Sequence, residues 1–94
     1  MILAKISDGG ILTLCDEDIL GKHFEDEHHT LDITRRFYQG EILSKKELLK
    51  VLESATCLNL VGKSSVAFVL GEGFISQKDV LFIQGVAHVQ IYAV

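Results

Sequence analysis

The chain has 94 residues, the size of one small domain. Apolar residues make up 48% and charged residues 23%, so we expect a folded globular protein rather than a disordered chain. Nine basic and 13 acidic residues give a formal net charge of −4, which argues against a general polyanion-binding surface. A single domain over residues 1–94 is therefore expected.

Cysteine content and hydropathy indicate the compartment. Cys15 and Cys57 allow at most one internal disulfide, and their strand-like surroundings favour a reduced, cytoplasmic protein with buried thiols. The N-terminus has no basic segment followed by a long apolar one, so no signal peptide is expected. No apolar run approaches the roughly 20 residues of a membrane span. We expect neither membrane association nor a cofactor.

The first predicted element is a β-hairpin. Two apolar, strand-like runs cover residues 2–6 and 11–15, and Gly9 and Gly10 in the turn between them can take positive φ at low cost. Asp16 follows the second strand and is expected to cap a single helical turn that ends at Gly21.

The middle of the chain is more polar. Residues 22–29 are expected to form a loop, and residues 30–34 alternate as a half-exposed strand does. A connection over residues 35–40 follows. Ser44 and Glu47 then have the spacing of a capping box, which predicts the start of an amphipathic helix.

The C-terminal half is less charged and should supply most of the core. Residues 57–61 form either an extended segment or a connection between helices, and residues 62–72 predict a second, largely buried helix. Two strands, 80–83 and 88–93, are expected around a turn at residues 84–85 or a longer turn that includes them. The predicted fold is α+β, with an N-terminal β-hairpin, two central helices, C-terminal strands and a mostly antiparallel sheet.

Gly62, Lys63 and Ser64 precede the second helix and suggest a phosphate-binding loop. The complete motif requires a glycine five residues before the Gly-Lys pair, where this chain has Cys57. We therefore reject a nucleotide phosphate loop, although free backbone amides at a helix start weakly favour an anion.

A group of histidines and acids in the 22–29 segment has the composition of a metal site. Imidazoles and carboxylates are good zinc or nickel ligands, but no histidine pair has the spacing of one helix turn. We favour a solvated loop and expect no metal. The group comprises His23, Glu25, Asp26, Glu27, His28 and His29.

Cys15, Asn59 and His88 include the residue types of a cysteine-nucleophile triad. Nothing in their spacing requires them to meet, and a cysteine at a strand end is more often a small core residue. Catalysis is therefore the less favoured interpretation.

Arg35 and Arg36 directly precede Phe37 and Tyr38. Aromatic rings stack on the bases of single-stranded RNA while arginines bind phosphate. The alternative, which we favour from these residues alone, is that Phe37 fills the core and Tyr38 covers it.

His88 and Gln90 would lie on the same face of a strand, because successive side chains alternate between faces. Two polar side chains facing one way indicate either the solvated face of a sheet or part of a site.

Four segments in order resemble a known family. They are Cys15-Asp16 with Leu20-Gly21-Lys22 and Phe24, Phe37-Tyr38 with Gly40-Glu41, Ala55-Thr56 with Asn59-Leu60-Val61-Gly62, and Gly85-Val86 with His88 and Gln90. Over nearly its whole length the chain resembles the small archaeal proteins grouped as domain of unknown function 424. The family's last motif has proline and alanine where this chain has Ala87 and Val89.

The resemblance implies an archaeal cytoplasmic protein with a loose association with RNA and translation. It implies Asn59, His88 and Gln90 as the polar site positions, and Cys15, Asp16, Tyr38 and Glu41 as outer candidates for the same site. We therefore expect a non-catalytic binding module whose partner is RNA or a ribosome-associated protein. The alternatives are a small enzyme or small-ligand-binding protein that uses Cys15, Asn59 and His88, and a structural homo-oligomer such as a homodimer.

Overall fold

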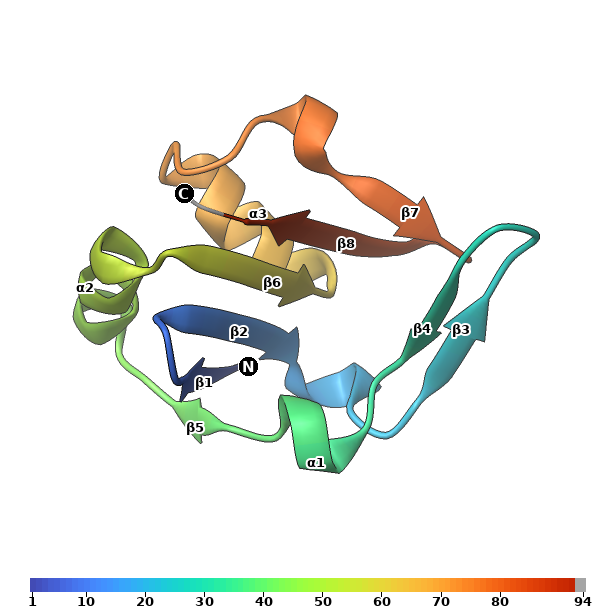
Figure 1. Ribbon diagram of the computed structural model, residues 1–94, viewed down its shortest axis with the longest axis horizontal. Helices are drawn as coiled ribbons and strands as arrows, with labels where there is room; N and C mark the ends of the chain where they lie inside the picture. The colour runs from blue at the N-terminus through green and yellow to red at the C-terminus, as the bar shows by residue number, and fades with distance from the viewer. Residues whose placement is uncertain (93–94) are drawn as a thin grey trace.

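The computed structural model describes residues 1–92, which form a six-stranded sheet, a two-stranded sheet and short helices (Figure 1). The strands are β1 (Ile2–Ser7), β2 (Ile11–Asp16), β3 (His23–Glu25), β4 (Thr30–Asp32), β5 (Glu41–Ile42), β6 (Cys57–Val61), β7 (Leu81–Ile83) and β8 (Val86–Ile91). The α-helices are α1 (Arg35–Tyr38), α2 (Lys45–Ser54) and α3 (Lys63–Gly71), and single 3₁₀ turns cover Glu17–Ile19 and Gln77–Asp79.

The six-stranded sheet has the order β5-β1-β2-β6-β8-β7. Its neighbouring strands are antiparallel except for β2 and β6, which run parallel and pair Cys15 with Val61. Parallel neighbours need a long crossover, and here the chain between them forms the β3–β4 hairpin, α1, β5 and α2. The predicted α+β fold with a mostly antiparallel sheet is confirmed.

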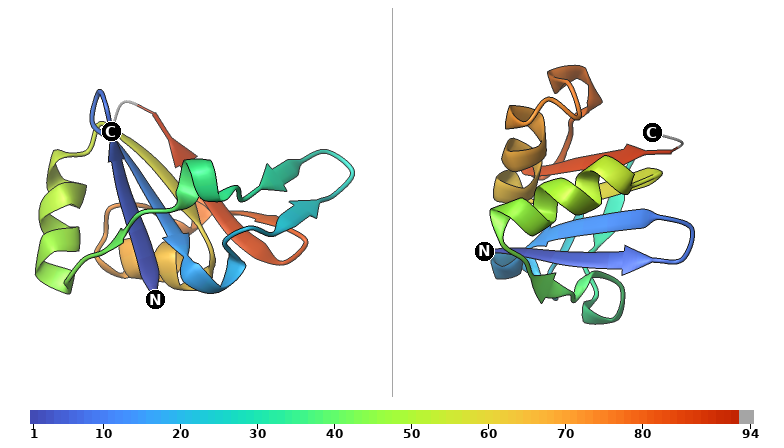
Figure 2. Two further views of the ribbon diagram at one scale, coloured as in Figure 1. Left: turned by 90° about the horizontal axis from the view of Figure 1, so that it is seen from below. Right: turned by 90° about the vertical axis from the view of Figure 1, so that its left-hand side faces the viewer.

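One face of the sheet is covered by α2 and α3, which Figure 2 shows on the side opposite α1 and the β3–β4 hairpin. Alternate residues of the central strands, Leu12 and Leu14 in β2 and Leu58 and Leu60 in β6, are buried under these helices. Leu48 and Leu52 of α2 pack in the same core. The alternation follows from the two-residue period of a strand.

The second face of the sheet has a smaller apolar core beneath α1 and the hairpin. It contains Cys15, Leu31, Ile33, Tyr38, Val61 and Ile83. This cover reaches only part of the face, and Gln90 of β8 stays exposed. A sheet that is closed on one face and half open on the other leaves room for a site on the open part.

Several predicted elements are confirmed. The N-terminal hairpin pairs Ile2 with Asp16 and Ser7 with Ile11. Helix α2 has the full capping box, in which Glu47 N–H donates to Ser44 Oγ at 3.1 Å and Ser44 N–H donates to Glu47 Oε1 at 3.0 Å. Residues 57–61 are a central strand, so the first of the two alternatives for that segment holds.

The turn between β7 and β8 also lies where predicted, with Gln84 at φ 50° and Gly85 at φ 79°. Two successive positive φ values are the geometry of a tight hairpin turn. Strand β8 begins at Val86 rather than at His88, and the predicted strand end at Ala93 lies outside the described residues.

The polar middle of the chain departs from the prediction. His23–Glu25 is a strand rather than part of a loop, because it pairs with Thr30–Asp32 and places Phe24 opposite Leu31. The expected connection contains α1, whose first turn is capped by the Thr34 hydroxyl, which accepts from Phe37 N–H at 3.2 Å. None of the helices within residues 1–92 is long and apolar enough to span a membrane.

Candidate functional site

A cavity of about 430 Å³ lies where the β3–β4 hairpin meets Tyr38 and the outer strands β7 and β8. Its walls combine polar and apolar side chains, in contrast to the closed core on the helix side. The lining residues are His28, His29, Thr30, Leu31, Asp32, Tyr38, Leu81, Ile83, His88 and Gln90.

His88 is fixed by a hydrogen bond to the neighbouring strand. Its Nδ1 lies 2.9 Å from the Leu60 carbonyl oxygen, which can only accept, so Nδ1 carries the hydrogen. Burial lowers the pKa of His88 below its ordinary value of 6.5, although this hydrogen bond acts in the opposite direction. At neutral pH the ring is uncharged and Nε2 is an acceptor.

Asn59 lies beside Tyr38 and Gln90 on the open face of the sheet. The register pairs Asn59 with Gln90, and Asn59 Nδ2 donates to the Tyr38 hydroxyl oxygen at 3.3 Å. Burial raises the pKa of Tyr38, so its hydroxyl stays protonated and keeps a hydrogen to donate. Asn59 Oδ1 is buried and has no hydrogen-bond partner, which is costly unless a ligand or water supplies one.

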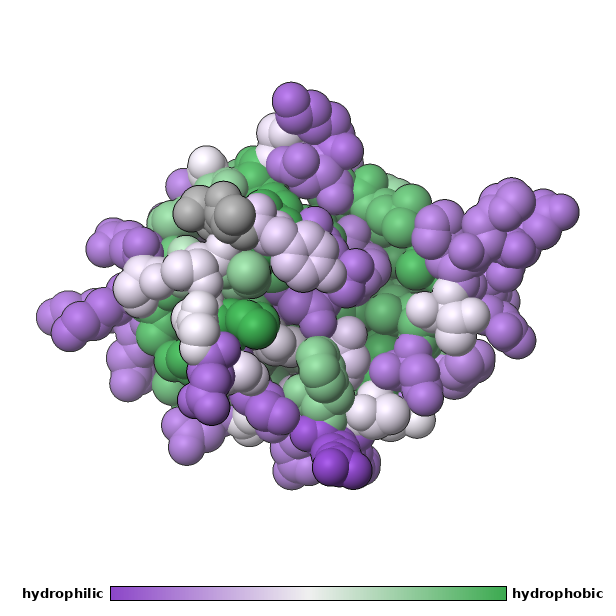
Figure 3. Space-filling model, in the orientation of Figure 1, coloured by the Kyte–Doolittle hydropathy of each residue, from purple (hydrophilic) through white to green (hydrophobic). Residues whose placement is uncertain are grey.

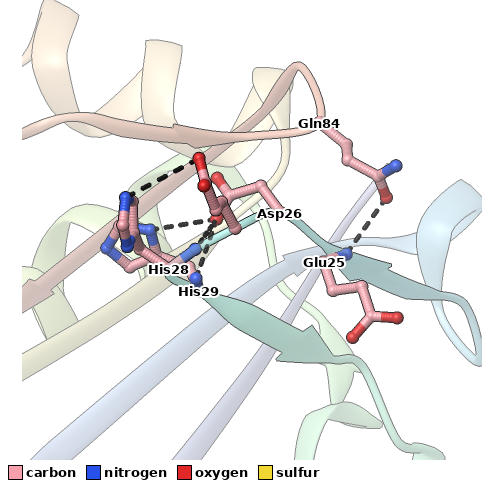
Figure 4. A network of polar contacts seen from close by, with 6 residues as sticks. Glu25, Asp26, His28, His29 and Gln84 are labelled. Atoms are coloured by element: carbon pink, nitrogen blue, oxygen red, sulfur yellow. Dashed lines mark hydrogen bonds and ion pairs between the residues drawn. The ribbon is translucent and has the colours of Figure 1, made fainter.

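The hairpin wall of the cavity is held by its own hydrogen bonds (Figure 4). Asp26 Oδ1 accepts from the His28 N–H at 2.9 Å, from the His29 N–H at 2.7 Å and from His29 Nδ1 at 3.3 Å. The Glu25 N–H donates to Gln84 Oε1 at 3.0 Å and ties the hairpin to the β7–β8 turn. These contacts hold the hairpin that supplies His28 and His29 to the cavity lining.

The same bonds give part of the hairpin's group of acids and histidines a structural role. Asp26 acts as the acceptor that closes the turn, and the backbone hydrogen bond from His28 is the main cause of its lowered pKa. Within residues 1–92 no three His, Cys, Asp or Glu side chains are arranged to hold a metal ion.

Cys15 is fully buried and does not line the cavity. Cys15 and His88 both pair with Val61, so β6 separates them and their Cα atoms are about 10 Å apart. Burial raises the pKa of the Cys15 thiol to about 12, and the thiol donates to the Asp16 carbonyl oxygen at 3.3 Å. This geometry does not provide the thiolate–imidazole pair that a cysteine nucleophile needs.

Helix α1 presents an exposed aromatic and basic surface next to the cavity. Phe37 is 53% exposed, so the expectation that it fills the core is wrong, whereas Tyr38, expected to cover the core, is itself buried in the second core. Lys5 Nζ donates to the Arg36 carbonyl oxygen at 3.0 Å and lies 5.7 Å from the centre of the Phe37 ring. Arg35 and Arg36 are exposed.

The start of α3 is not free to bind an external anion. Asp16 Oδ2 accepts from the Ser64 N–H at 2.9 Å, and Oδ1 accepts from the Ser65 N–H at 2.8 Å. Asp16 therefore caps α3 instead of the 3₁₀ turn that follows it, where it makes no side-chain capping bond. Gly62 precedes the helix at φ 108°, and a Cβ there would lie 2.6 Å from Asp16 Oδ1.

The positions that the family resemblance implied therefore separate into two groups. Asn59, His88, Gln90 and Tyr38 lie in or beside the cavity, while Cys15 and Asp16 are structural. Glu41 is exposed on edge strand β5, away from the cavity lining. Sequence reasoning missed that His28, His29 and Asp32 face His88 across the cavity, since no local pattern connects the hairpin to β8.

The fold and the cavity define a small α+β domain with a polar, half-open site on one face of its sheet. The chain belongs to the family described as "Protein of unknown function (DUF424)", whose sequence profile matches residues 5–94. This confirms the family resemblance.

A solved structure has a similar fold. The chain is similar to an uncharacterized conserved protein from Methanopyrus kandleri, with a TM-score of 0.81 and 28% sequence identity over 99% of this chain and 91% of that one. No curated protein matches the chain.

Proposed function

We propose that this protein is a non-catalytic binding module for single-stranded RNA, acting with the translation machinery in the archaeal cytoplasm. The family resemblance supports the association with translation in the archaeal cytoplasm. The observation that carries the RNA proposal is the surface of α1, where the exposed Phe37 ring lies 5.7 Å from the Lys5 ammonium and directly follows the exposed Arg35 and Arg36 in the chain.

That surface combines the two kinds of contact that single-stranded RNA uses. A base stacks on an aromatic ring, and the ring of Phe37 is open to solvent. Phosphates bind cationic side chains, which Lys5, Arg35 and Arg36 supply. Tyr38, which packs against Phe37 with ring centres 4.9 Å apart, continues the surface into the cavity.

The net charge of −4 limits the kind of binding that is expected. A protein with this balance has little general attraction for a polyanion, so few phosphates should be contacted. We expect modest affinity, a shallow salt dependence and a preference for particular sequences.

The test is fluorescence anisotropy with labelled single-stranded RNA at several salt concentrations. Phe37→Ala should weaken binding by about tenfold, because loss of base stacking on an aromatic ring costs about 1–3 kcal/mol. The matched control is Phe82→Ala, since Phe82 is 56% exposed but lines a separate pocket beside α3. Equal affinities of the two variants would contradict the proposal.

A second pair of variants tests the phosphate contacts. Arg35→Ala with Arg36→Ala should flatten the dependence of log K on log salt by about 0.7 for each lost contact. Lys45→Ala with Lys46→Ala removes the same charge from α2, on the opposite side of the sheet, and should leave the slope unchanged. Co-sedimentation of wild type with archaeal ribosomes, lost in Phe37→Ala, would support the translation setting.

Small-ligand binding without RNA is the second candidate, and the unpartnered Asn59 Oδ1 beside the cavity favours it. Native mass spectrometry of protein purified from archaeal cells would show a retained small molecule, and the same spectrum would report whether the protein is a homodimer. A retained ligand together with no RNA affinity would replace the first proposal with this one.

A further inference from the structure

The cavity beside α1 differs in charge from the surface of α1 itself. Its lining has no lysine or arginine, and it includes the acidic residue Asp32. Near neutral pH such a lining disfavours a phosphate group. A neutral group that donates hydrogen bonds is the better occupant.

Three polar side chains of the cavity lining, two on β8 and one on α1, offer a defined set of hydrogen bonds. The Nε2 atom of His88 is an acceptor because Nδ1 donates to Leu60. The Tyr38 hydroxyl accepts from Asn59, which leaves its own hydrogen free to donate. Gln90 is exposed at the edge of the cavity and its amide supplies both a donor and an acceptor.

The remaining walls are partly apolar. Leu31, Leu81 and Ile83 line the same cavity and supply the apolar surface against which a ring can pack. Figure 3 shows this face of the molecule, with apolar side chains over β7 and hydrophilic ones over the end of the β3–β4 hairpin. A volume of about 430 Å³ lies within the usual range for small-ligand pockets.

We propose that this cavity seats one unstacked adenine base, with Gln90 pairing to the base edge and His88 Nε2 accepting from its amino group. Glutamine forms a two-bond pair with the amino group and ring nitrogen of adenine, which uses both halves of its amide. The inference rests on the proposed RNA function for the source of the base: phosphates bind along α1, and the next base enters the cavity past Tyr38.

The experiment compares RNA oligomers and free nucleosides on the same samples. Wild-type protein should bind a uridine 10-mer with one central adenosine about tenfold more tightly than the all-uridine 10-mer. Gln90→Ala should remove that preference, and because Gln90 is exposed the variant should remain folded. Gln77→Ala is the matched control, since Gln77 is exposed and does not line this cavity.

Amide and histidine NMR spectra of labelled protein supply a second measurement that is independent of RNA. Adenosine should shift the resonances of His88 and Gln90, whereas purine riboside, which lacks the amino group, should shift them far less at the same concentration. An unchanged adenosine preference in Gln90→Ala, or equal shifts with both nucleosides, would overturn the adenine site while leaving RNA binding along α1 intact.

The two proposals fail in different ways. RNA affinity that depends on Phe37 but is indifferent to adenosine supports the α1 surface and rejects the adenine site. Shifts with adenosine but no RNA affinity support a nucleoside site and reject the RNA function. If the protein shows neither RNA affinity nor shifts with adenosine, both proposals are rejected.

Discussion

Asp16 and Ser65 are joined by two hydrogen bonds although 49 residues separate them in the chain. The backbone N–H of Ser65 donates to Asp16 Oδ1 at 2.8 Å, and its hydroxyl donates to the same oxygen at 2.7 Å. Both residues are buried. The first N–H groups of a helix have no partner within the helix, so a carboxylate at the end of β2 completes the start of α3.

Replacement of this carboxylate should destabilise the fold. We expect Asp16→Ala to lower the free energy of unfolding by about 2–4 kcal/mol, because it leaves the buried N–H and hydroxyl of Ser65, and the partly buried N–H of Ser64, without an acceptor. Urea denaturation measures the change. Asp18→Ala removes the same charge from an exposed position and should stay within about 0.5 kcal/mol of wild type. Equal stability of the two variants would show that the cap is dispensable.

Elements that depend on neighbouring residues could be predicted from the sequence. The capping box of α2 needs only Ser44 and Glu47, three residues apart, and the N-terminal hairpin needs two apolar runs around Gly9 and Gly10. Strand β3 gave a weak signal, since Phe24 is its one apolar residue and its pairing depends on β4.

Contacts between distant parts of the chain could not be predicted in this way. Asp16 has the same local pattern whether it caps the next turn or a helix far along the chain. The parallel pairing of β2 with β6 decides that choice, because it brings the end of β2 to the start of α3. The cavity is equally non-local, since His29 and His88 line one cavity only when the hairpin folds over β8.

The stability of the protein should depend on pH through His88. Its pKa in the folded state is lowered, so the unfolded chain binds a proton more readily and stability is lost as pH falls from about 6.5 through the folded pKa. Above the unfolded pKa, the contribution of neutral His88 to the free energy of unfolding is fully present. His28, His29 and Asp32 line the same cavity and also titrate. The variant His88→Gln keeps these groups, so the difference between wild type and this variant isolates the effect of His88.

Urea denaturation at pH 7.5, 6.5 and 5.5 gives the measurement. Wild type should lose stability across this interval, and His88→Gln should lose less. The lowered pKa values of Asp26 and Glu47 place their titration below the interval. A wild-type stability that is constant, or that rises on acidification, would contradict the assignment of His88 as a neutral, buried group.

The two thiols should differ in reactivity. Cys15 is fully buried with a pKa of about 12, so iodoacetamide at neutral pH should not modify it in the native protein. Cys57 is partly exposed and serves as the internal comparison. Mass spectrometry after tryptic digestion should find modification at Cys57 first, with Cys15 modified only in denaturant. Rapid native alkylation of Cys15 would revive the cysteine-nucleophile alternative.

The hydrogen bond between Glu25 and Gln84 should control the motion of the cavity wall. Gln84→Gly removes the acceptor of the Glu25 N–H but suits the positive φ of the turn. We expect faster hydrogen exchange at the Glu25 amide in this variant, while exchange in the central strands β2 and β6 stays unchanged. Gln84→Glu keeps an acceptor oxygen at the same reach and should preserve most of the protection. If both variants exchange like wild type, the hairpin is held by Phe24 and Leu31 packing against the second core, and the tether is incidental.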